Sequence, residues 1–109
     1  MKYYSTNKNS PVADFKEATI KGQAPDKGLY FPETIPQVDK DLINNIDKYS
    51  NEEIAFRVIK PYVGDTIDEK RLQEIVSETI NFPLPLVKVN EDIFSLELFH
   101  GPTLAFKDV

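Results

Sequence analysis

The sequence predicts an α+β fold: a small, mainly helical N-terminal domain with short strands, followed by a β-hairpin and the start of another helix. Between residues 39 and 80, apolar residues recur with the period of about 3.6 that marks helices packed by one face. Pro83 and Pro85 then favour extended backbone over helix. On both sides of residues 90–92, short runs of β-forming residues have the pattern of two paired strands. These three observations together predict the fold class.

The composition of the 109 residues is that of a soluble globular protein, with 40% hydrophobic and 28% charged residues. The net charge is −5 and no Lys/Arg cluster is present, so we expect no nucleic-acid partner. The absence of cysteine excludes thiol catalysis, disulfides and cysteine-based zinc sites, and the single histidine excludes a histidine-rich metal site. No signal peptide and no apolar run of about 20 residues is visible, so we expect a cytoplasmic protein with no membrane partner.

The first elements are a strand and a short helix. Residues 2–6 have β-propensity and predict the strand. Ser10 and Pro11 have the residue types of an N-cap and a first helical position, which predicts a helix over residues 12–20. Gly22 is expected to end this helix.

A turn and a second short strand follow. In Pro25-Asp26-Lys27-Gly28, proline presets φ, aspartate closes an Asx turn and glycine is expected to supply a positive φ. Leu29-Tyr30-Phe31 predicts a strand that Pro32 ends, with the aromatic pair as a buried anchor.

Three amphipathic helices are predicted next. The first covers residues 39–49. The second begins with a capping box formed by Ser50 and Glu53, and Pro61 is expected to kink it or end it early. The third begins with a similar box at residues 66–69. Short connections predict that the three helices pack face to face.

The prolines after these helices predict a domain boundary. We expect one domain over residues 1–83 and the beginning of a second, truncated one over residues 84–109. The second starts with a hairpin formed by residues 86–89 and 93–98.

The final stretch holds the candidate chemistry. Gly101 and Pro102 break the second hairpin strand, and Thr103 is expected to cap a helix whose first turn carries Lys107. Asp108 is expected to cap or orient that turn. A lysine near a helix start is usually a solvated surface residue, and the alternative is a reactive amine beside a helix end that binds anions.

The string His-Gly-Pro-Thr-Leu-Ala-Phe-Lys-Asp at residues 100–108 resembles the pyridoxal-phosphate lysine motif of threonine synthases, which are fold type II pyridoxal-phosphate enzymes. Ala-Pro-Asp-Lys-Gly-Leu-Tyr-Phe-Pro at residues 24–32 is similar to a string in their N-terminal parts. The likeness covers the whole chain. It identifies the chain as the N-terminal part of a threonine synthase, with residues 84–109 as the start of the catalytic domain.

The resemblance implies the cofactor pyridoxal 5'-phosphate and the conversion of O-phospho-L-homoserine and water to L-threonine and phosphate. It implies that Lys107 holds the cofactor covalently and then moves protons, and that Phe106 lies close to the cofactor ring. His100 is expected to be a hydrogen-bonded structural residue or a contact to the phosphorylated substrate. Thr103 is expected to cap the helix, or to position the substrate or the loop around it.

Two alternatives stay open. One is another fold type II pyridoxal-phosphate lyase or synthase, and the other is a non-enzymatic helical interaction module. The four glycines are scattered, so no Gly-rich loop is present to hold a cofactor phosphate, and we expect the 109 residues alone to be inactive. The apolar residues from 93 to 109 are expected to stay mobile or to make the fragment self-associate.

Overall fold

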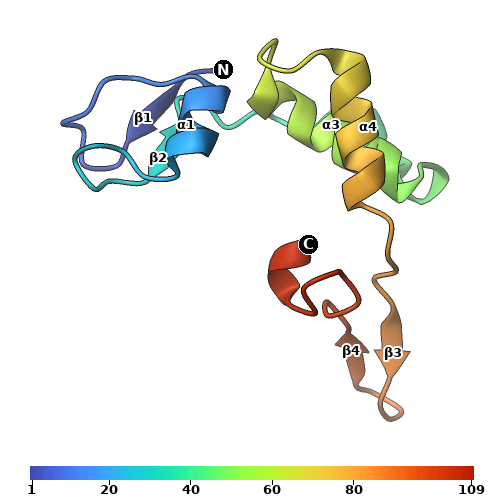
Figure 1. The fold of residues 1–109 in the computed structure, drawn as a ribbon. Helices are drawn as coiled ribbons and strands as arrows, with labels where there is room; N and C mark the ends of the chain where they lie inside the picture. The colour runs from blue at the N-terminus through green and yellow to red at the C-terminus, as the bar shows by residue number, and fades with distance from the viewer. The chain divides into compact units, whose positions relative to one another are not determined.

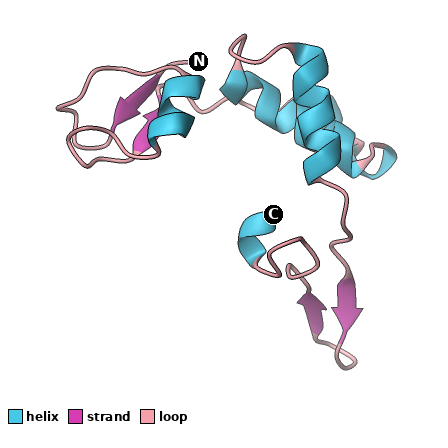
Figure 2. Cartoon of the chain, viewed as in Figure 1, coloured by secondary structure: helices cyan, strands magenta, loops and turns pink.

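Four α-helices and two antiparallel strand pairs build the chain, in a computed structural model that describes residues 1–109 (Figures 1 and 2). The α+β prediction is confirmed. Contacts divide the chain into two units, Met1–Val76 and Ser77–Val109. The domain boundary at residues 83 and 84 stays a prediction, because contacts alone do not define a folding domain.

The first strand pair joins β1 (Tyr3–Ser5) to β2 (Tyr30–Pro32), with Tyr4 opposite Phe31. β1 also pairs on its other side, because Tyr3 and Ala13 exchange backbone hydrogen bonds of 2.8 and 2.9 Å. Residue 13 is therefore extended, and the predicted helix over residues 12–20 starts too early. The helix α1 (Phe15–Lys21) begins after Asp14, whose carboxylate accepts from the backbone N–H of Glu17 at 2.8 Å.

The Asx turn at Asp26 is confirmed, and it holds more of the chain than the sequence predicted. Its carboxylate accepts from the buried Ser5 hydroxyl at 2.6 Å and from the backbone N–H groups of Gly28 and Asn9. These bonds, the Ser5 bond foremost, lower the pKa of Asp26 to about 2. Ser10, predicted as a helix cap, instead accepts from the Asp26 backbone N–H at 3.0 Å.

Glycine is needed at position 28 for a reason other than the predicted one. The positive φ of the turn falls on Lys27, at 66°. A Cβ on Gly28 would come 2.9 Å from the backbone nitrogen of Asn7 and closer still to the Ser5 hydroxyl. The glycine therefore permits a close approach of two loops.

A small aromatic core lies under this strand pair. Tyr3, Ala13 and Ala18 are buried, and Met1, Phe15 and Tyr30 pack against them. The Tyr3 hydroxyl donates a 2.8 Å hydrogen bond to the backbone carbonyl of Tyr62, which links the first strand to the third helix. The predicted buried aromatic anchor is correct only in part, because Tyr30 is half-buried but Phe31 is 43% exposed.

The predicted helix over residues 39–49 is interrupted. It consists of α2 (Lys40–Asn44) and a 3₁₀ turn, η1 (Ile46–Lys48). The break falls at Asn45, whose side-chain amide donates to the Asp41 carboxylate at 2.9 Å. The same amide also donates to the Asp41 backbone carbonyl at 3.3 Å, a local side-chain bond to the backbone that disfavours the helix interior.

The capping box of α3 (Asn51–Val63) is confirmed by both reciprocal hydrogen bonds between Ser50 and Glu53. Pro61 does not end α3, which continues to Val63 and stops before Gly64. In α4 (Glu69–Thr79), Asp68 caps in place of the predicted Thr66, since its carboxylate accepts from the N–H groups of the next turn. The buried residues on the helices of the first unit are Leu42, Val63, Leu72 and Val76.

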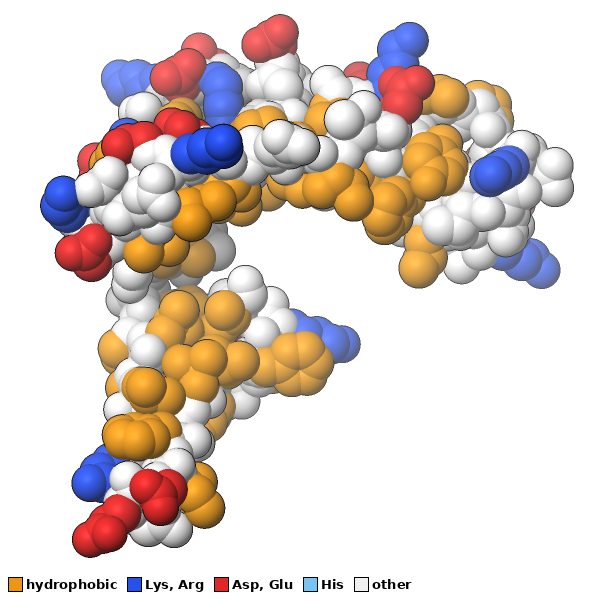
Figure 3. All heavy atoms as spheres, turned by 180° about the vertical axis from the view of Figure 1, so that it is seen from behind, with side chains coloured by type: hydrophobic (Ala, Val, Ile, Leu, Met, Phe, Trp, Pro, Cys, Tyr) orange, Lys and Arg blue, Asp and Glu red, His pale blue; other side chains and the backbone are white.

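The predicted hairpin is confirmed as β3 (Leu86–Lys88) paired with β4 (Phe94–Leu96). The side chain of Asn90 accepts from the backbone N–H groups of Asp92 and Ile93 and so builds the turn. All six strand residues are exposed, and Figure 3 shows hydrophobic side chains gathered over this second unit. None of the four helices has the length and apolar character needed to cross a lipid bilayer.

Candidate functional site

The segment after β4 folds into two consecutive turns that end the chain. The backbone N–H of Glu97 donates to the Pro85 carbonyl at 3.0 Å, which extends the hairpin toward the motif. A turn then closes between Gly101 and Leu104, and a 3₁₀ turn, η2 (Phe106–Asp108), follows. Lys107 therefore lies on a single 3₁₀ turn, where the sequence predicted the first turn of a capped helix.

Thr103 is paired with Asp108 and does not cap the turn. Its hydroxyl donates to one carboxylate oxygen at 2.6 Å, and its backbone N–H donates to the other at 2.9 Å. The residue in the N-cap position is Ala105, whose methyl side chain cannot accept a hydrogen bond. The predicted cap is therefore wrong, because a stronger acceptor, a carboxylate, engages the Thr103 hydroxyl. The prediction that Asp108 orients the loop fits this geometry.

Gly101 is required by the same pairing. It is buried, and its φ is not positive. A Cβ at this position would lie 2.5 Å from the Asp108 Cβ and 2.6 Å from one of its carboxylate oxygens. The glycine thus leaves the space that the aspartate side chain fills, whereas the sequence suggested only a need for backbone freedom.

Lys107 borders an open hollow of about 800 Å³ within the second unit. The residue is exposed, and its amine takes part in none of the four ion pairs of the chain. The carboxylate of the neighbouring Asp108 accepts hydrogen bonds from Thr103 instead. The residues lining the hollow are Glu78, Thr79, Asn81, Phe82, His100, Gly101, Pro102, Lys107 and Asp108.

His100 shares the hollow with Lys107 and is also hydrogen-bonded. Its Nε2 lies 2.7 Å from a carboxylate oxygen of Glu97, and its ring stacks on Phe99 with centroids 4.7 Å apart. These contacts fit the structural role expected for the histidine. Because it also lines the hollow, a contact to a ligand there is geometrically open to it.

Two other predicted site residues lie outside the lining. Thr103 and Phe106 are exposed and do not border the hollow, and Phe106 is 69% exposed, so it is not packed in a core formed by residues 1–109. Its position next to Lys107 on η2 is the only part of the expected arrangement that the structure displays.

Sequence reasoning missed part of the hollow. Asn81 and Phe82 line it, yet the sequence marked them only as part of the predicted domain boundary. No local signal marks them, because the contact with the motif spans about 20 residues of chain. Glu97, the partner of His100, had a weak signal in its spacing of three residues from the histidine.

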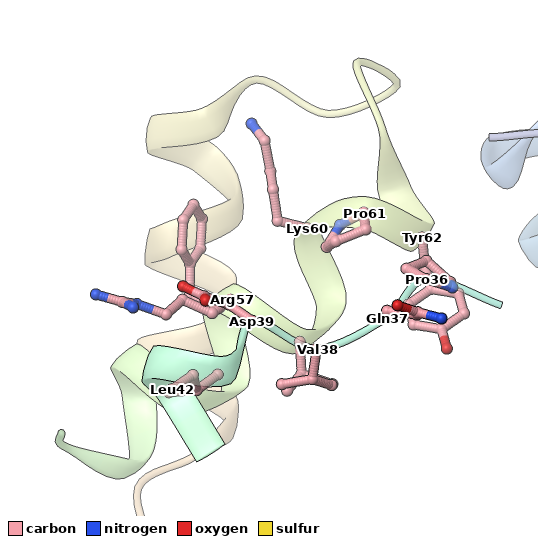
Figure 4. A pocket seen from close by; sticks show the side chains of 11 residues that line it. Pro36, Gln37, Val38, Asp39, Leu42, Arg57, Lys60, Pro61 and Tyr62 are labelled. Atoms are coloured by element: carbon pink, nitrogen blue, oxygen red, sulfur yellow. The ribbon is translucent and has the colours of Figure 1, made fainter. Parts of the chain in front are cut away.

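A second hollow, of about 390 Å³, lies in the first unit between residues 36–39 and α3 (Figure 4). Its lining includes Leu42, Pro61 and Tyr62, and it contains no residue of the motif. Nowhere in the chain do three or more histidine or acidic side chains come together to hold a metal ion.

Comparison with known proteins identifies the family. Residues 2–80 match the family model described as the threonine synthase N terminus. The chain belongs to the threonine synthase N-terminal family. The threonine synthase of Pseudomonas aeruginosa is 38% identical over 99% of this chain, and that of Saccharomyces cerevisiae is 40% identical over 98%.

Solved structures of threonine synthases also match this chain. The pyridoxal-phosphate-bound threonine synthase from Brucella melitensis is 41% identical, covers 100% of the chain and has a TM-score of 0.87. The threonine synthase from Escherichia coli is 34% identical, covers 99% and has a TM-score of 0.86. The resemblance drawn from the motifs is confirmed. The chain spans about a quarter of the length of these relatives, from 23% to 25%.

Proposed function

We propose that this chain supplies the cofactor lysine of a pyridoxal-phosphate-dependent threonine synthase, a lyase that converts O-phospho-L-homoserine and water to L-threonine and phosphate. The observation that carries the proposal is the position of Lys107, an amine without an ion pair at the edge of an open hollow. The motif around this lysine lies in a chain that is 41% identical to a pyridoxal-phosphate-bound threonine synthase.

The residues of the hollow fit such a cofactor. Pyridoxal phosphate, when bound, supplies an aldehyde that takes up an amine and a ring that accepts electrons. Lys107 carries an amine, the group that such an aldehyde takes up, and this amine lies at the edge of the hollow without an ion-pair partner. In the same hollow, Phe82 offers an apolar ring and Asn81 an amide. Lys107 would bind the cofactor first and carry protons between substrate atoms afterwards.

The neighbours of Lys107 are assigned supporting roles. We propose that His100 contacts the phosphorylated substrate through Nδ1, the ring nitrogen that Glu97 does not engage. We also propose that Phe106 lies beside the cofactor ring. The Thr103 hydroxyl donates its hydrogen bond to Asp108. We therefore propose that Thr103 positions the loop and does not donate to the substrate phosphate.

The proposal extends to the 109 residues as an isolated piece. They contain no Gly-rich loop to hold the cofactor phosphate, so we expect them to be inactive alone. We also propose that the isolated piece self-associates through the apolar surface of residues 84–109, and that the protein works in the cytoplasm.

Borohydride trapping tests the proposal in the protein at its natural length. After incubation with pyridoxal phosphate and reduction, peptide mass mapping should place the pyridoxyl group on Lys107. Lys107→Arg should abolish the label, because a guanidinium keeps the charge but cannot attach the aldehyde. Lys88→Arg, an exposed lysine on β3, is the matched control and should leave the label unchanged.

A label on another side chain, or none, would contradict the proposal. The two alternatives predict different results. A non-enzymatic module should take up no cofactor. A different fold type II enzyme should be labelled on Lys107 but should release no phosphate from O-phospho-L-homoserine.

A further inference from the structure

We propose that Asp108 is a positioning residue, which holds the loop of residues 101–108 closed through Thr103 and so presents the Lys107 amine, unpaired, to the hollow. This inference rests on the proposed function of Lys107. It assigns a task to a residue for which the motif by itself offered only a general capping or orienting role.

Both oxygens of the Asp108 carboxylate accept hydrogen bonds from Thr103. One oxygen accepts from the Thr103 hydroxyl at 2.6 Å and the other from the Thr103 backbone N–H at 2.9 Å. Hydrogen bonds to an ionised acceptor are about twice as strong as neutral ones. The pair bridges five residues and fastens the first turn of the loop to the second, with Lys107 next to the fastening point.

The space for this pairing is built into the backbone. Gly101 is buried directly against the Asp108 side chain, where any larger residue would collide with it. Leu104, between the paired residues, has a φ of 57°, a conformation that non-glycine residues seldom adopt. A loop that accepts an uncommon backbone conformation must be held by its surroundings, and the Thr103–Asp108 pair is the side-chain contact that does so.

The pairing has a second consequence for Lys107. An ion pair with a nearby carboxylate would hold the Lys107 amine away from a ligand in the hollow. Thr103 engages both carboxylate oxygens of Asp108, and Asp108 is not paired with Lys107. The amine is thus left without a carboxylate partner at the edge of the hollow, where an aldehyde can reach it.

The test compares Asp108→Asn with wild type in the protein at its natural length. Two quantities are measured: hydrogen exchange of the Thr103 amide without cofactor, and the rate at which pyridoxal phosphate becomes attached to Lys107, from borohydride trapping. Thr103 presents two donors, its hydroxyl and its backbone N–H. The asparagine side chain has one oxygen that accepts and one NH₂ group that donates, so it cannot accept from both in the same way. We expect exchange about tenfold faster and attachment about tenfold slower.

Other variants keep the test valid if Asp108→Asn folds poorly. Gly101→Ala should produce both effects by displacing the unchanged aspartate. Thr103→Val removes only the hydroxyl donor and should slow attachment, whereas Thr103→Ser keeps both donors and should restore the wild-type rate. Asp92→Asn removes the same charge from the exposed hairpin turn and should change neither quantity.

The outcomes separate the two proposals. If Asp108→Asn and Gly101→Ala accelerate exchange but leave attachment unchanged, the pair is merely structural and the inference is overturned. If exchange is unchanged, the pair does not hold the loop, which also overturns it. If wild type attaches no cofactor at Lys107, the proposed function fails, and the positioning role fails with it, whatever the exchange shows.

Discussion

Two aspartates, Asp26 and Asp108, organise the loops on which the motifs lie. Each accepts a side-chain hydroxyl at 2.6 Å together with backbone N–H groups, and each has a pKa below its ordinary value, chiefly because of that hydroxyl. The sequence predicted the local bond of Asp26 to Gly28. The sequence did not predict that Asp26 pairs with Ser5 or that Asp108 pairs with Thr103. No periodic pattern in a sequence indicates which acceptor a hydroxyl will bind.

At the residue scale, Asp26 makes folding sensitive to acid. Its pKa is about 2 in the folded chain and about 3.9 when unfolded, so the ionised carboxylate stabilises the folded state above about pH 4. That stabilisation should disappear as the pH falls from about 4 to about 2, because protonation then favours the unfolded state. Urea unfolding of the natural-length protein between pH 6 and pH 2 measures the effect.

Asp26→Asn should lower stability at pH 6 and flatten its decline below pH 4, since the group that titrates is gone. Asp47→Asn, an exposed acid on η1, is the control and should follow the wild-type curve. An equally steep acid decline in Asp26→Asn would show that other carboxylates cause it.

At the element scale, helix ends were predictable where their caps are local. The Ser50 and Glu53 box and the stop at Gly64 were identified correctly because the partners lie within one turn. The start of α1 was misplaced because Ala13 pairs with β1, ten residues earlier, and that pairing keeps it extended. Tertiary pairing of this kind overrides a favourable local cap such as Ser10-Pro11.

The N-cap of α3 allows a direct test of how much a local cap stabilises the fold. Ser50→Ala removes the acceptor for the Glu53 backbone N–H and should lower the free energy of unfolding by about 1 kcal/mol. Ser77→Ala, an exposed serine inside α4, is the matched control and should change stability by less than about 0.5 kcal/mol. Chemical denaturation measures the free energy of unfolding of both variants. Equal losses of stability in the two would show that the cap is not the cause.

At the scale of the whole molecule, buried and exposed apolar residues are unevenly distributed. All the buried hydrophobic residues lie between Tyr3 and Val76. Eleven of the twenty exposed large hydrophobic side chains lie between residues 84 and 109. Hydrophobic side chains gather over the second unit in Figure 3. The sequence predicted uncovered apolar residues from 93 to 109, and the structure adds the exposed residues Leu86 and Val87 of β3 to them. Exposed apolar surface of this kind favours association.

The isolated 109 residues should therefore self-associate as concentration rises, as sedimentation velocity can measure. Phe94→Thr with Leu96→Thr, two exposed residues of β4, should shift the distribution toward monomer while keeping β-propensity. Val12→Thr with Ile20→Thr removes two exposed apolar side chains from the first unit and should have no such effect. A monomer at every concentration, or equal effects of both pairs, would contradict the proposed surface.

The hydroxyl of Tyr3 and the carbonyl of Tyr62 are separated by 59 positions in the chain. During translation, the opening strand therefore emerges from the ribosome long before its anchor on the third helix has been synthesised. Until then β1 can only pair with Ala13 and β2, and its attachment to the helical layer waits for the nascent chain to grow past residue 62.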